Sequence, residues 1–124
     1  MGLIADVGAT YLLPRTIGVD RALKMCFTGE IVDAAEALRI GLVTELVPHD
    51  RLLTAANELA LKIAEGPSIA IQMAKRGIYR AVGGDYAASL EYESFAQGVC
   101  FKTADFQEAL TAFKEKRKAK YQGK

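Results

Sequence analysis

Few side chains in this sequence combine a reactive type with the spacing that enzyme chemistry requires. The single histidine, His49, directly follows Pro48 at the end of an apolar run, which favours a loop residue over a catalytic base. Ser68 and Ser94 have no base near them in the sequence, so a hydrolytic triad is not indicated. One histidine and two distant cysteines predict no metal site. No phosphate-binding loop or dinucleotide fingerprint occurs.

The two cysteines, Cys26 and Cys100, lie far apart in amphipathic segments, and we expect buried free thiols in a reducing compartment. The first residues lack the basic and long apolar regions of a secretory signal peptide. No apolar stretch approaches the roughly 20 residues that span a bilayer. A cytoplasmic protein with no membrane partner is therefore expected.

Positive charge is concentrated at the end of the chain. Residues 113–124 hold six of the 16 Lys and Arg residues and one acid, whereas the rest of the chain is net acidic. Such a run is typical of a solvated helix face or a frayed end, and binding to a phosphate-bearing partner is the main alternative. Nucleic acid is the weakest candidate, because Tyr121 is the one aromatic residue among these cations.

The elements that must position any site are mostly helices. Start and stop signals predict a helix over 20–28 that is capped by Asp20 and closed by Gly29. Asp33 and Glu36 have the spacing of a capping box for a helix over 33–40. Helical spacing of apolar residues predicts further helices over 52–63, 69–81 and 86–101, and a last one that begins near Asp105.

One segment has a different character. Residues 42–47, Leu-Val-Thr-Glu-Leu-Val, are rich in β-branched residues between Gly41 and Pro48, and they predict a single strand. Its backbone groups need partners, and the chain offers none except Leu3-Ile4. A mainly α chain with one or two short strands and no sheet of its own is expected, with part of the fold supplied from elsewhere.

The order of short motifs resembles that of the crotonase (enoyl-CoA hydratase/isomerase) family. Residues 2–18, Gly-Leu-Ile-Ala-Asp-Val-Gly-Ala-Thr-Tyr-Leu-Leu-Pro-Arg-Thr-Ile-Gly, resemble a stretch in the middle of these proteins. Each motif is weak by itself, but together they run in order with fitting spacing to residue 123. The later motifs are Arg21-Ala22, Phe27-Thr28-Gly29, Ala34-x-Glu36-Ala37, Gly41-Leu42-Val43, Val47-Pro48, Asp105-Phe106, Ala112-Phe113 and Glu115-Lys116-Arg117.

The resemblance implies a place in the fold. Crotonases form an α/β spiral followed by a helical C-terminal region that builds a trimer. By this resemblance, residues 1–48 are the end of the enzyme core and residues 49–124 are the helical trimerisation region. Family members are roughly twice as long, so the oxyanion hole and most of the coenzyme A pocket would lie in a preceding half. The expected partners are an acyl-CoA substrate and further copies of the chain, as a trimer or a dimer of trimers. No separate cofactor is expected.

The resemblance also assigns two site residues. Leu3-Ile4-Ala5-Asp6-Val7-Gly8 is close to the pattern of dienoyl-CoA isomerases, in which the Asp transfers a proton on one side of the acyl chain and an earlier Glu acts on the other. The alternative is that Asp6 caps a helix that starts near Val7. Lys116 matches a lysine that reaches the phosphates of coenzyme A on a neighbouring subunit, and its alternative is a solvated tail residue.

The implied function is part of a fatty-acid-metabolising lyase or isomerase. Such an enzyme hydrates or isomerises the double bond of enoyl- and dienoyl-CoA thioesters through an enolate. The alternative is a helical oligomerisation module from the same family without its chemistry. In either case the truncated surface predicts that the isolated chain self-associates.

Overall fold

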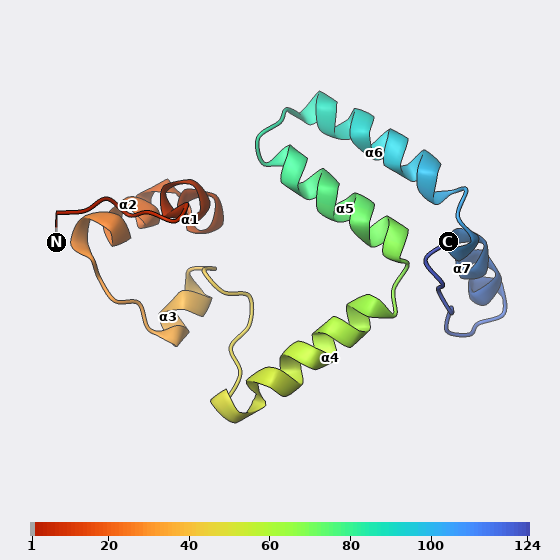
Figure 1. The fold of residues 1–124 in the computed structure, drawn as a ribbon, viewed down its shortest axis with the longest axis horizontal. Helices are drawn as coiled ribbons and strands as arrows, with labels where there is room; N and C mark the ends of the chain where they lie inside the picture. Colours follow the sequence, from red (N-terminus) through yellow and green to blue (C-terminus); the bar gives the residue numbers. More distant parts are fainter. Residues whose placement is uncertain (1) are drawn as a thin grey trace. The chain divides into compact units, whose positions relative to one another are not determined.

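A computed structural model describes residues 2–124, in which every regular element is a helix (Figure 1). The chain divides into two compact units, one ending at Leu52 and the other beginning at Leu53. In chain order the elements are α1 (Ala9–Ile17), α2 (Val19–Thr28), α3 (Ala34–Arg39), the 3-10 turn η1 (His49–Arg51), α4 (Leu52–Ala64), α5 (Ser68–Ala81), α6 (Tyr86–Cys100) and α7 (Ala104–Lys114). The expectation of a mainly helical chain is confirmed.

The first unit has a small core where α1, α2 and α3 meet. Ile17, Ala22 and Ile40 are each less than a tenth exposed. Four half-buried side chains pack against them: Leu13, Met25, Val32 and Leu42. Burying apolar side chains in this way is the main stabilising force available to such short helices, which are marginal alone.

Glycines set the ends of α2. Gly18 precedes the helix, and Gly29 ends it in the left-handed conformation, with φ of 63° and its N–H donated to the Met25 carbonyl. The predicted stop at Gly29 is therefore confirmed. The predicted cap is wrong, because Gly18 and not Asp20 is the N-cap residue and no side chain caps this end. Asp20 lies inside the first turn, where a negative charge is still favourable.

At α3 the predicted capping box is half formed. The Asp33 carboxylate accepts a hydrogen bond from the Glu36 N–H at 2.8 Å. The Glu36 side chain does not return to Asp33 but pairs with Arg39, at 2.5 Å from its Nε. That ion pair lowers the pKa of Glu36, chiefly through the hydrogen bond from the guanidinium.

The predicted strand over 42–47 is wrong for this chain. After Gly41 the backbone turns, and the N–H groups of Leu42 and Val43 are donated to the Ala37 carbonyl at the end of α3. The remainder of the segment forms no ladder, because residues 2–124 contain no second strand to pair with it. β-branched composition favours an extended backbone, but a strand also needs a hydrogen-bonding neighbour.

In the second unit α5 and α6 pack side by side as an antiparallel hairpin (Figure 1). The two helices approach closely at Gly77, where an added Cβ would stand 2.9 Å from the Tyr92 ring. The Tyr92 hydroxyl donates to the Met73 carbonyl at 3.0 Å, so the ring lies across α5. Asp85 caps α6 by accepting from the Ala88 N–H at 2.9 Å.

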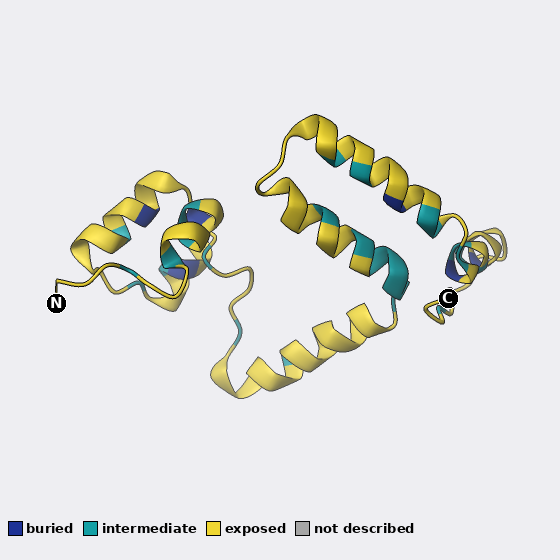
Figure 2. Cartoon of the chain, turned by 45° about the horizontal axis from the view of Figure 1, so that its top comes forward, coloured by how far each residue is buried: buried dark blue, intermediate teal, exposed yellow. Residues whose placement is uncertain are grey.

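Apolar side chains remain widely exposed in both units (Figure 2). No residue of α4 is buried, and Leu53 is 77% exposed. Phe27 and Phe113 are each more than four-fifths exposed. Apolar side chains exposed to this extent usually mark surfaces that another polypeptide covers. Among residues 2–124 no helix is long and apolar enough to cross a bilayer.

Candidate active-site loop and C-terminal clasp

Asp6 lies in a loop with an unusual backbone just before α1. Val7 has φ of 51° and Gly8 has φ of 82°, so two successive residues are left-handed. A β-branched residue in this region is a genuine outlier, and such strain costs about 1–3 kcal/mol. The Asp6 carbonyl accepts from the Ala9 N–H at 2.9 Å, which closes a tight turn around the two strained residues. The turn therefore holds the Asp6 side chain at the start of α1.

The carboxylate of Asp6 does not cap that helix. The N-cap residue of α1 is Gly8, and no side chain accepts a hydrogen bond at this end. Asp6 is exposed, and within residues 2–124 its carboxylate makes no hydrogen bond or ion pair. The capping alternative is therefore wrong, whereas the catalytic assignment of Asp6 stays a prediction.

An apolar pocket of about 560 Å³ lies beside this loop, within the first unit. Three of the lining residues directly precede Asp6, namely Leu3, Ile4 and Ala5. The other lining residues come from α1 and α2. The complete lining is Leu3, Ile4, Ala5, Ala9, Thr10, Pro14, Val19, Ala22, Leu23, Cys26 and Phe27. A mostly apolar lining with few polar groups suits a hydrocarbon ligand better than a charged one.

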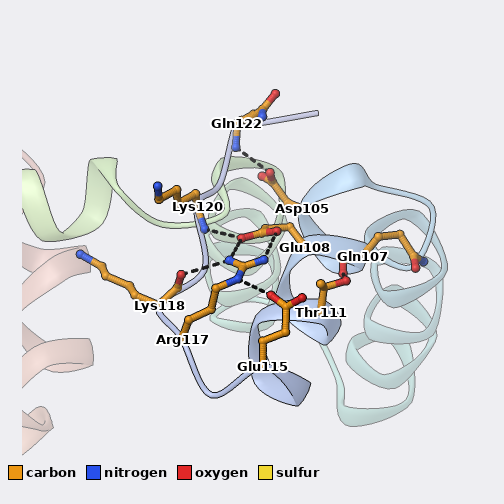
Figure 3. Close-up of polar contacts among 9 residues, drawn as sticks. All are labelled: Asp105, Gln107, Glu108, Thr111, Glu115, Arg117, Lys118, Lys120 and Gln122. Carbon is orange, nitrogen blue, oxygen red and sulfur yellow. Dashed lines mark hydrogen bonds and ion pairs between the residues drawn. The ribbon is translucent and has the colours of Figure 1, made fainter.

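The basic end of the chain is folded back against α7 and is not frayed (Figure 3). The Arg117 guanidinium binds Glu108 through both terminal nitrogens, at 2.5 and 3.0 Å, and donates from Nε to Glu115 at 2.6 Å. Glu108 also accepts from the Lys120 N–H at 2.8 Å. These hydrogen bonds lower the pKa of Glu108 to about 2, the bond from Arg117 being the larger cause.

Asp105 extends the same arrangement further along the tail. It is 3% exposed, and its two carboxylate oxygens accept the N–H groups of Gln122 at 2.6 Å and Gly123 at 2.9 Å. Its own N–H is donated to the Lys124 carbonyl. We call Asp105, Glu108 and Arg117, with the tail that they hold, the C-terminal clasp.

Asp105 thus has a role that its sequence position did not indicate. The N-cap of α7 is Thr103, whose hydroxyl accepts from the Phe106 N–H at 3.1 Å. Asp105 lies inside the first turn of the helix, so its carboxylate does not cap α7 and instead accepts the backbone N–H groups of the tail. Sequence reasoning missed the clasp because its acids and its partners are 9 to 18 residues apart. The spacing of residues within a single helix does not indicate contacts over such separations.

Lys116 follows the last turn of α7 in the left-handed conformation, with φ of 53°. Its N–H is donated to the Phe113 carbonyl, and the Arg117 N–H is donated to the Ala112 carbonyl. These two bonds are those of a Schellman motif, in which glycine usually occupies the position of Lys116. The Lys116 side chain is exposed and makes no ion pair within residues 2–124. Its assignment to coenzyme A phosphates stays a prediction.

The remaining candidates are His49 and the two cysteines, of which Cys26 lines the apolar pocket. His49 begins the 3-10 turn η1. Both cysteines are free, as expected, but Cys26 is exposed and Cys100 only half-buried, so the prediction of buried thiols is wrong. Both lie on helix faces that this chain leaves partly uncovered. Within residues 2–124 no three His, Cys, Asp or Glu side chains are grouped so that they could hold a metal ion.

Known proteins share both the sequence and the fold of this chain. The sequence profile described as "Enoyl-CoA hydratase/isomerase" matches residues 1–124. The chain is 40% identical to "Short-chain-enoyl-CoA hydratase" of Clostridium acetobutylicum over 118 residues, which are 95% of this chain and 45% of that protein. It is 34% identical to "Crotonyl-CoA hydratase" of Syntrophomonas wolfei over 121 residues, 98% of this chain and 46% of that one.

Solved structures give the same result. The enoyl-CoA hydratase of Bacillus anthracis superposes with a TM-score of 0.95 and 40% identity, covering 99% of this chain and 48% of that one. The chain therefore spans about half the length of the relatives that it matches. Its helices correspond to the C-terminal helical part of the crotonase fold. By sequence and by fold, the chain belongs to the enoyl-CoA hydratase/isomerase family.

Proposed function

We propose that this chain is the C-terminal part of an acyl-CoA enzyme that hydrates or isomerises the double bond of enoyl- or dienoyl-CoA thioesters. The relatives are named hydratases, which supports hydration of enoyl-CoA. The isomerase part of the proposal rests on Asp6. The observation that carries it is an unpartnered carboxylate on a strained turn next to an apolar pocket.

For isomerisation, the proposed chemistry is a pair of proton transfers next to a thioester. A base takes a proton from a carbon of the acyl chain, and the electron pair moves through the double bond to the thioester oxygen as an enolate. A proton is then delivered at another carbon, and the thioester carbonyl re-forms. Two positioned acid–base groups suit this reaction. In the proposal Asp6 is one, and the other, with the donors that hold the enolate oxygen, comes from outside residues 1–124.

The apolar pocket supports the place of the acyl chain. Its wall begins with the three residues before Asp6, so a hydrocarbon chain bound there runs alongside the carboxylate's segment. Lys116 is the proposed contact for the coenzyme A phosphates, where a mobile ammonium acts as a point charge. The proposed partners are the acyl-CoA and further copies of the chain as a trimer or a dimer of trimers.

The second candidate is a helical oligomerisation module without chemistry of its own. The exposed apolar side chains of α4 and of the α5–α6 hairpin favour it, because they offer a large surface for association. The two candidates differ in turnover. The module binds its copies but converts no thioester, whereas the enzyme part gains activity when the preceding half is present.

The deciding experiment follows absorbance of enoyl- and dienoyl-CoA substrates with this chain and with a longer protein that adds a preceding half. We expect turnover from the longer protein and none from the 124-residue chain. In the longer protein, Asp6→Asn is expected to reduce isomerisation by a factor of about 10²–10⁴ while acyl-CoA affinity changes little. Asp50→Asn removes an exposed carboxylate elsewhere and serves as the matched control. Unchanged isomerisation in Asp6→Asn would contradict the assignment.

A further inference from the structure

The turn that carries Lys116 is held by its two neighbours. Glu115 and Arg117 flank Lys116 in the sequence, and their side chains are joined by an ion pair of 2.6 Å. The guanidinium is fixed a second time by the two bonds to Glu108 on α7. A left-handed lysine costs free energy, so this conformation persists where the surroundings hold it. Glu108 and Arg117 are those surroundings.

The clasp also separates the cations of the tail into two groups. Arg117 is occupied by Glu108 and Glu115, and Lys118 is paired with Glu65 at 2.6 Å. A guanidinium with its donors already bound has little left to offer to a phosphate. Lys114, Lys116, Lys120 and Lys124 make no ion pair within residues 2–124, and of these four Lys116 sits on the fixed turn. The anchored cations thus hold the backbone, and Lys116 is left available for an anion.

We infer that Glu108 and Arg117 are positioning residues for Lys116, which set the direction of its ammonium group toward the phosphates of coenzyme A. This inference rests on the proposed function, because it takes the phosphate contact of Lys116 as given. The inference extends the proposed function by assigning a role to Glu108 and Arg117, which touch no substrate. The gain comes from fixing the backbone beneath a flexible side chain, so that less conformational freedom is lost when the phosphate binds.

The test is a double-mutant cycle on coenzyme A binding by the longer protein that adds a preceding half, measured by calorimetry at one fixed ionic strength. Lys116→Met removes the ammonium, and Glu108→Gln removes the charge of the anchor at nearly constant shape. Lys114→Met, which removes an exposed cation two residues away, is the matched control. Amide hydrogen exchange at Lys120 reports whether the tail is still held.

We expect Lys116→Met to weaken binding about 5- to 10-fold and Lys114→Met less than about 2-fold. Glu108→Gln is expected to weaken binding about 3-fold or more and to speed exchange at Lys120. The double variant should bind no more weakly than Lys116→Met alone, because the anchor acts through that lysine. A purely structural effect of Glu108 would instead add to the loss from Lys116→Met.

Three results would overturn the inference in distinguishable ways. Equal losses from Glu108→Gln in both backgrounds would show that the anchor supports the fold and not Lys116. Unchanged affinity in Glu108→Gln, whether or not Lys120 exchanges faster, would show that Lys116 needs no anchor. If Lys116→Met binds coenzyme A as the unaltered longer protein does, the proposed phosphate contact itself fails. The proposed role of Asp6 would be untouched, since turnover tests it separately.

Discussion

Replacing Lys116 by glycine should stabilise the chain. A non-glycine residue in the left-handed region costs about 1–2 kcal/mol. Glycine avoids this cost, but it loses more backbone conformational entropy on folding, which reduces the gain in stability by about 0.5–1 kcal/mol. The expected net gain for Lys116→Gly is about 0.5–1 kcal/mol in the free energy of unfolding. The same motif ends α3, where Gly41, with φ of 79°, already occupies the corresponding position.

The measurement is thermal or urea unfolding of the full 124-residue chain, followed by circular dichroism. A gain of this size corresponds to a rise in Tm of roughly 2–6 °C for a unit of this length. Lys116→Ala is the matched control, because it also removes the side chain but keeps a Cβ in the left-handed region. Equal stability of the glycine and alanine variants would refute the reasoning, since the gain would then come from the lost charge and not from the backbone.

Three further changes test the packing, the caps and the clasp. Gly77→Ala should destabilise the hairpin by about 1–3 kcal/mol, because the new Cβ would stand 2.9 Å from the Tyr92 ring. Gly98→Ala is the control: nothing lies within 4 Å of its Cβ, so the higher helix propensity of alanine should stabilise the hairpin by about 0.5–1 kcal/mol. Asp85→Ala should cost about 1 kcal/mol in thermal unfolding, through loss of the cap of α6. Glu108 has its pKa lowered from 4.5 to about 2 in the folded chain, so its stabilising bonds are fully present above about pH 5 and are lost as the pH falls toward 2. Exchange of the tail amides measured down this pH range should therefore accelerate, and the Glu108→Gln variant should lack that dependence.

Helices were predictable from the sequence where the decisive signal is local. Gly29 ended α2 because its left-handed φ suits glycine, and Asp33 capped α3 through a bond to a residue three positions away. Predictions that depend on one turn of backbone were mostly right.

Features that depend on distant partners were not predictable. Residues 42–47 have the composition of a strand, yet a strand is a property of two segments, and no partner occurs in residues 2–124. Asp105 has the position of a helix-start residue, but Thr103 takes the capping bond and leaves the carboxylate to the tail. For the site, resemblance supplied Asp6 and Lys116, and both assignments stay predictions. The strain at Val7 and the anchoring of Lys116 depend on backbone conformation and on partners distant in the sequence, which no local pattern encodes.

The contact between Gly77 and Tyr92 fixes the register of the α5–α6 hairpin. The tyrosine ring fits where α5 has no side chain, and its hydroxyl reaches the carbonyl of Met73 one turn earlier. If α6 slid along α5 by one turn, about 5.4 Å, the ring would meet the side chain of Met73 or Ala81 instead of the glycine. The contact therefore favours this alignment of the two helices over one shifted by a turn, and whatever packs against the hairpin meets side-chain rows held in this register.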